Sequence, residues 1–170
     1  TVPAVAQQQL NFARIGYLLS GFKPPKEFFE AMSGLGYIDG YNVAYQYRSS
    51  EGGEEGLFEE ALDFSRHKLE VIVVAGADAA LAAKKATQTI PIIYLGGGDP
   101  VRLGLVSSLA RPGGNLTGIT ELSPELTAKR LQLIKEILPK ISAISVLARA
   151  GAPGLGGQVQ ELQHQAKGLR

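Results

Sequence analysis

The chain contains no cysteine and only two histidines among its 170 residues. Without cysteine there can be no disulfide bond, thiolate metal site or cysteine nucleophile. The absence of cysteine does not identify the cellular compartment. His67 and His164 both fall in predicted helices, remote from the strand ends where a ligand would bind. A solvent-facing helix position is the simpler interpretation of His67, so hydrolytic and metal-dependent chemistry is disfavoured.

An excess of one charge and a long apolar run are also missing. The 17 basic and 16 acidic residues leave a net charge of +1. They are scattered along the chain, so no nucleic-acid partner is expected. No run approaches the roughly 20 consecutive apolar residues that a membrane-spanning helix needs. The 21 glycines and nine prolines fall between apolar runs, which is typical of a globular domain.

The motifs of the common nucleotide-binding and hydrolytic enzymes are not found. No Gly-Lys-Ser/Thr sequence ends a P-loop, and no closely spaced glycine triplet follows the first predicted strand, as a dinucleotide site would require. Ser20 and Gly21 stand where a receiver domain would carry an acidic pair. No nucleophile elbow or pair of clustered carboxylates is present. We therefore expect no cofactor.

Short apolar runs alternate with amphipathic stretches from Arg14 onward, which predicts βαβ units and a doubly wound parallel sheet of the α/β class. The run 71–75 is apolar without alternation, which is typical of a strand covered on both faces. Strands are predicted at 15–19, 43–47, 71–75, 91–95, 115–120 and 144–147. Helices are predicted after Pro24-Pro25, along the stripe 57–69, and at 78–87, 101–109, 123–139 and 158–170.

Candidate ligand contacts follow from the predicted sheet. In an open parallel sheet, ligands bind outside the carboxyl ends of the strands, where helix N-termini direct backbone N–H groups into the crevice. The residues that follow the predicted strands are Ser20, Gly21, 76–78, 96–99 and 117–120. Glycines 96–98 could bring the backbone close to a ligand or simply form a turn. Asp99 could accept from a ligand amine or cap the segment that follows Pro100.

Other strand-end residues have two interpretations as well. Asp78 could cap its helix while the amides of Gly76 and Ala77 face an anion. Tyr17 and Tyr94 lie nearest the predicted crevice and could stack on a ligand, although half-buried packing is the commoner role of a strand tyrosine. The stretch 1–13 is expected to be a flexible tail, in which Ala4-Val5-Ala6 could instead be the remnant of a signal peptide.

The string Ser-Leu-Ala-Arg-Pro-Gly-Gly-Asn-Leu-Thr-Gly, residues 108–118, carries a family resemblance. With Gly98-Asp99-Pro100-Val101 and the stretch 125–139, it resembles the solute-binding proteins of ABC transporters with the type I periplasmic-binding fold. More narrowly, the chain resembles the subfamily that includes aromatic amino acid binders, and the similarity covers nearly everything from Arg14 to about Leu147. It implies a periplasmic or otherwise extracytoplasmic protein that is not an enzyme and hands a small molecule, such as an amino acid, to a membrane permease.

The resemblance also implies a division of the chain and a set of contacts. Residues 14–122 would form the first ligand-binding lobe, and 123–170 the hinge crossing and the start of a second lobe. Contacts from the strand ends would come from Ser20, Gly21, Gly76, Ala77, Gly97, Asp99 and Thr120. Exposed lobe surface, or exchange of the segment after Ser123, could pair two copies into a homodimer. A small-molecule enzyme that uses Asp99 and a ligand-sensing regulatory lobe are the alternatives.

Overall fold

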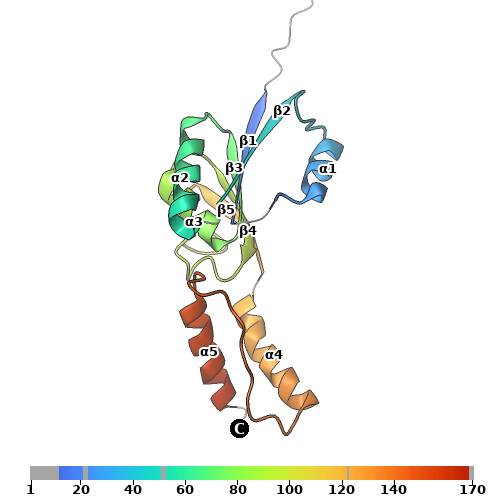
Figure 1. Cartoon of the computed structure of the whole chain (residues 1–170), viewed down its shortest axis with the longest axis vertical. Helices are drawn as coiled ribbons and strands as arrows, with labels where there is room; N and C mark the ends of the chain where they lie inside the picture. The colour runs from blue at the N-terminus through green and yellow to red at the C-terminus, as the bar shows by residue number, and fades with distance from the viewer. Residues whose placement is uncertain (1–11, 21–22, 51–52, 122, 169–170) are drawn as a thin grey trace, which may run out of the picture.

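The computed structural model describes residues 12–20, 23–50, 53–121 and 123–168. Five strands form an all-parallel sheet in the order β2-β1-β3-β4-β5 (Figure 1). Their bounds are β1 Ala13–Leu19, β2 Val43–Ser49, β3 Val71–Ala75, β4 Ile92–Gly97 and β5 Leu116–Glu121. The chain moves outward from β1 in both directions, so the predicted doubly wound α/β fold is confirmed. Strand β1 begins at Ala13, inside the predicted tail, and residues 1–11 lie outside the described part of the chain.

Helices cover the sheet unequally. Helix α1, Lys26–Gly34, lies on one face, and α2, Gly53–Arg66, packs beside α3, Ala77–Ala86, on the other (Figure 1). Helices α4, Ser123–Ile137, and α5, Leu155–Lys167, lie side by side beyond the carboxyl ends of the strands (Figure 1). The described chain therefore has two parts: a sheet part, residues 12–121, and a smaller helical part, residues 123–168.

Strand β3 is buried on both faces, as its unbroken apolar sequence predicts. Ile72 and Val74 belong to the core under α2 and α3, while Val73 belongs to the core on the α1 face. All three are at most 4% exposed. Fully burying a valine or isoleucine side chain contributes about 1.5–3 kcal/mol. The central strand thus anchors both layers.

The predicted short helix at 101–109 is wrong, because the segment consists of a turn at 101–104 followed by bends and coil. The amide of Leu103 donates to the Asp99 carbonyl, and that of Leu105 to the Pro100 carbonyl, at 3.0 and 2.8 Å. Gly104 then adopts a φ of +69°. A left-handed residue ends a right-handed helical turn, so the helix cannot continue.

The predicted sixth strand at 144–147 is also wrong, because this segment belongs to none of the described strands. A strand requires a neighbour to complete its hydrogen bonds, and no other described segment pairs with this one. Its apolar side chains are open to solvent, with Leu147 fully exposed and Val146 56% exposed. The last helix begins at Leu155, three residues before the predicted start, after Gly154 with a φ of +77°.

Gly118 tests the contact between β4 and β5. A Cβ at this position would lie 2.0 Å from the Tyr94 carbonyl oxygen, which is backbone and cannot rotate away. Gly118→Ala is therefore expected to lower the free energy of unfolding by about 1–3 kcal/mol, measured by urea denaturation. The matched control is Gly114→Ala, where a Cβ would meet nothing within 4 Å. Equal stability of the two variants would contradict the close approach of the strands.

Candidate ligand-binding site

The carboxyl ends of all five strands meet at one edge of the sheet, here called the strand-end edge. The pairing aligns Leu19 with Ser49 and Ala75, and Ala75 with Leu95. Gly96 pairs with Thr120 in the next row. The structure therefore brings six of the seven predicted contacts to this edge, namely Ser20, Gly76, Ala77, Gly97, Asp99 and Thr120. The seventh, Gly21, lies outside the described residues.

Gly76 connects β3 to α3 in a conformation that favours glycine. Its φ is +94°, and the helix it opens has no side-chain cap. The Gly76 amide donates to the Leu95 carbonyl at 3.0 Å. The expectation that this amide faces an anion is therefore wrong, because the sheet already uses it. Gly76 shapes the turn, and the first-turn amide of Ala77 is the better donor for a ligand.

Two hydroxyl groups hold the glycine run at the end of β4. The Tyr94 hydroxyl donates to the Gly97 carbonyl and the Thr120 hydroxyl to the Gly98 carbonyl, both at 2.7 Å. Tyr94 is only 2% exposed, and burial raises the pKa of its phenol, so the group stays a neutral donor. The run thus ends β4 at the edge and leaves it at Gly98, which has a φ of +96°, while Gly97 is exposed.

The two tyrosines nearest the edge are packing residues. Tyr94 lies in the core beneath α2 and α3, whereas Tyr17 lies in the core on the α1 face and is 2% exposed. The Tyr17 ring meets Phe28 edge to face, with 5.1 Å between centroids. Burial raises the pKa of Tyr17 as well. Neither ring is available for stacking on a ligand in this conformation.

Asp99 caps the turn that replaces the predicted helix. Its Oδ1 accepts from the amides of Val101 and Arg102 at 2.9 and 3.2 Å. The capping interpretation of Asp99 is therefore the one that the hydrogen bonds support. The same carboxylate keeps a second oxygen for other partners.

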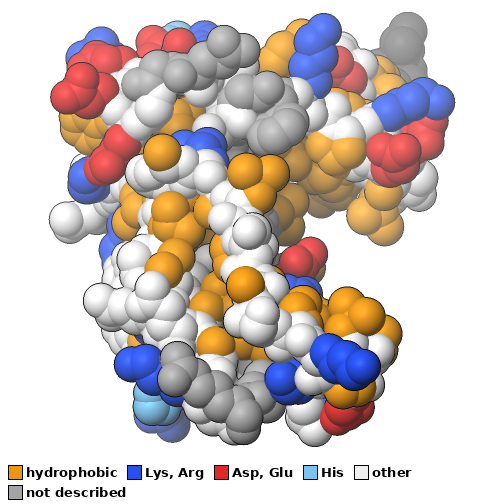
Figure 2. Space-filling model, turned by 60° about the horizontal axis from the view of Figure 1, so that its bottom comes forward, with side chains coloured by type: hydrophobic (Ala, Val, Ile, Leu, Met, Phe, Trp, Pro, Cys, Tyr) orange, Lys and Arg blue, Asp and Glu red, His pale blue; other side chains and the backbone are white. Residues whose placement is uncertain are grey.

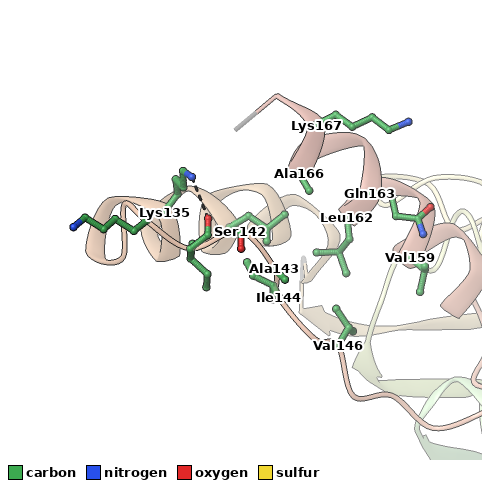
Figure 3. A pocket seen from close by; sticks show the side chains of 13 residues that line it. Lys135, Ser142, Ala143, Ile144, Val146, Val159, Leu162, Gln163, Ala166 and Lys167 are labelled. Carbon is green, nitrogen blue, oxygen red and sulfur yellow. Dashed lines mark hydrogen bonds between the residues drawn. The ribbon is translucent and has the colours of Figure 1, made fainter. Parts of the chain in front are cut away.

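A larger hollow lies in the helical part, where the sequence indicates no site. A groove of about 890 Å³ runs between α4, α5 and the segment 141–146. Apolar side chains, among them Ile144, Val146 and Leu162, gather in it (Figure 3), and Figure 2 shows this hollowed, largely hydrophobic face from the α4–α5 end. None of the predicted contact residues lines the groove. All its lining residues fall between Leu131 and Lys167, and in the sequence only the amphipathic pattern of the helices signals it.

One charged contact at the edge also escapes sequence analysis. Arg149, in the extended segment after α4, forms an ion pair with Asp78 in the first turn of α3. The two residues are 71 positions apart. The sequence interpretation of Asp78 as a helix cap could not anticipate this partner.

Thr120→Val removes the hydroxyl that holds the Gly98 carbonyl while keeping the shape of the side chain. We expect a loss of about 1 kcal/mol in the free energy of unfolding, seen as a lower midpoint in urea denaturation. Thr120→Ser, which keeps the donor, should recover most of it. The exposed Thr117, on the same strand, provides the control, and Thr117→Val should change stability by no more than about 0.5 kcal/mol. Similar losses at both positions would contradict the role of the Thr120 hydroxyl.

These features define a doubly wound α/β domain whose strand-end edge is built from turns and helix starts, which is the place where this class binds ligands. Residues 23–169 match the model of a protein family described as ABC transporter substrate binding protein. The chain belongs to that family. A curated relative, the tyrosine-binding protein of Clostridioides difficile strain R20291, is 34% identical over 146 residues. The match covers 85% of this chain and 41% of that protein.

Solved structures agree with this assignment. A conserved domain protein from Vibrio cholerae has a TM-score of 0.83 at 28% identity. A domain from Streptococcus pneumonia in complex with L-Trp scores 0.79 at 25% identity. A substrate binding protein with adhesive properties from Clostridium difficile, in its ligand-free, open form, scores 0.68 at 27% identity. Each match covers 92% of this chain and 54% of the other, so the chain spans about half the length of these proteins.

Proposed function

We propose that this chain is the ligand-binding part of an ABC-type uptake receptor and binds an amino acid at the strand-end edge. The observation that carries the proposal is the meeting of all five strand ends at one edge in a member of this family. Tyrosine and tryptophan are the first candidates, because one relative is a tyrosine-binding protein and one similar structure holds L-Trp.

The proposed contacts are those at the edge. The Ala77 amide and the exposed backbone of Gly97 offer main-chain groups, and Ser20 and Thr120 offer hydroxyl oxygens. Gly76 contributes through the shape of its turn, and Asp99 through its second carboxylate oxygen. Gly21 completes the proposed set from the neighbouring loop, outside the described residues.

We further propose that the chain performs no covalent chemistry and uses no cofactor. Asp99 is the titratable residue on which an enzyme at this edge would rely, and one of its oxygens already holds two backbone amides. A membrane permease is the proposed partner, and the periplasm or another extracytoplasmic space is the proposed location. Among the described helices, none is long and apolar enough to cross a membrane.

The proposed division of the chain is a first lobe at 14–122 and a hinge crossing with the start of a second lobe at 123–170. Helices α4 and α5 contact each other and stand beyond the sheet, which supports this division (Figure 1).

Ligand-dependent stabilisation tests the proposed function. A ligand that binds only the folded state raises the free energy of unfolding by about 2.7 kcal/mol when its concentration is a hundred times the Kd. L-Tyrosine or L-tryptophan is expected to raise the midpoint of thermal unfolding, with glycine as the control ligand. If neither of them, nor any other amino acid larger than glycine, shifts the midpoint, the proposal fails.

We also propose that two copies associate through the exposed surface of the helical part. The segment 144–147 has no strand partner among the described residues, and its side chains include the fully exposed Leu147. Exposed apolar strand-like segments promote pairing between chains. The occupant of the groove beside it would be the same segment of the second copy.

Light scattering after size exclusion checks the association. A mass near twice the 18.0 kDa of one chain is expected. Leu147→Lys should weaken the dimer at least tenfold, because the lysine would place a charge in the apolar contact. Leu35→Lys, at a 74% exposed leucine after α1, is the matched control. A monomer at all concentrations, or an equal effect of both variants, contradicts the proposal.

A further inference from the structure

The ion pair between Asp78 and Arg149 joins the two parts of the chain. Asp78 is the second residue of α3, and Arg149 lies in the extended segment that connects α4 to α5. The Asp78 side chain is 13% exposed and the Arg149 side chain 59%. A nearly buried carboxylate in the sheet part is therefore paired with a cation that reaches it from the helical part.

This pair lies at the proposed binding edge. Asp78 directly follows Gly76 and Ala77, at the carboxyl end of β3. The two parts also approach each other after β4, where a Cβ added to Gly154 would lie 3.5 Å from the side chain of Leu103. The N-terminal end of α5 thus meets the loop after β4, and Figure 1 shows this end close to the sheet. The helical part approaches the same edge that the ligand would use.

Both charged groups keep unused hydrogen-bonding capacity. The contact joins Arg149 Nη2 to Asp78 Oδ2. Within the described residues, neither side chain makes another hydrogen bond or ion pair. A guanidinium carries five N–H donors, and a carboxylate has two oxygens with about four acceptor sites. Oδ1 of Asp78 can therefore accept another donor, while the rest of the Arg149 fork can donate to another acceptor.

An α-amino acid supplies both missing groups from one carbon atom. Resting on the proposed function, we infer that Asp78 and Arg149 form a zwitterion subsite: Asp78 accepts from the α-ammonium group and Arg149 donates to the α-carboxylate. The four groups then alternate in charge, so no charge of the ligand is left unpaired at the edge. The protein would thereby select α-amino acids over amines and acids that have the same side chain.

Three probes that differ only in these groups test the inference on the full chain. L-Tryptophan carries both charges, tryptamine lacks the carboxylate, and indole-3-propionate lacks the ammonium. Isothermal titration should give a Kd for L-tryptophan at least tenfold below those of the other two, since charge-assisted hydrogen bonds are the strong ones. The corresponding tyrosine series is measured in parallel.

The variants should remove the two halves of this selectivity separately. Asp78→Asn is expected to weaken L-tryptophan and tryptamine at least tenfold while leaving indole-3-propionate unchanged. Arg149→Gln should weaken L-tryptophan and indole-3-propionate and leave tryptamine unchanged. Asp63→Asn, which removes a carboxylate paired with Arg48 between α2 and β2, is the control and should bind all three like the parent chain.

The outcomes separate this inference from the proposed function. If both variants weaken all three probes by one factor, or leave all three unchanged, the pair only joins the two parts and the subsite is refuted. If the parent chain binds none of the probes in either series and no other amino acid shifts its thermal midpoint, the proposed amino acid binding fails together with the subsite. Circular dichroism reports the folding of each variant. Arg149 is largely exposed, so Arg149→Gln decides the matter should Asp78→Asn fail to fold.

Discussion

The hydrogen bonds between parallel strands are the constraint on which the rest of this structure depends. Parallel pairing requires every strand to run in the same direction, so each crossover must return to the same end of the sheet. Here the register places Leu19, Ala75 and Leu95 in one row, and their following loops emerge together. The same ladder decides which main-chain groups remain for a ligand. It uses the Gly76 amide and leaves the first-turn amides of α3 at the edge.

Helices cover the two faces of the sheet to different extents. Under α2 and α3, four alanines of α3 are completely buried, which lets this helix lie close to β3 and β4. On the other face α1 covers the β1 and β2 side, where Phe28 contacts Tyr17 and Tyr45. The far strands on that face remain open, with Ile119 73% exposed and Ile93 38% exposed. Apolar surface that water would disfavour therefore persists at the sheet's far end and in the groove of the helical part.

Local patterns predict the fold well, and non-local partners explain what they miss. The apolar stripe of α2 and the unbroken apolar run of β3 are local signals, so both elements and the doubly wound fold class follow from the sequence. The helix at 101–109 fails because one backbone angle, at Gly104, interrupts a pattern that side chains alone support. The strand prediction at 144–147 fails because an apolar run can indicate a strand but cannot show whether a neighbouring strand is there to pair with it. At the edge, sequence analysis finds the right loops, but it cannot know that Leu95 takes the Gly76 amide or that Arg149 meets Asp78.

The weakness of the contact between the two parts follows from its exposure. An ion pair with one partner largely in solvent contributes about 0–1 kcal/mol, and beside it the described contacts between the parts are few. Such a contact contributes little to the free energy that holds the two parts in this arrangement. A ligand that adds charge-assisted hydrogen bonds to Asp78 and Arg149 would supply that free energy only when both parts are in place. Binding and closure would then be a single event, because neither residue can complete the contact from its own part of the chain.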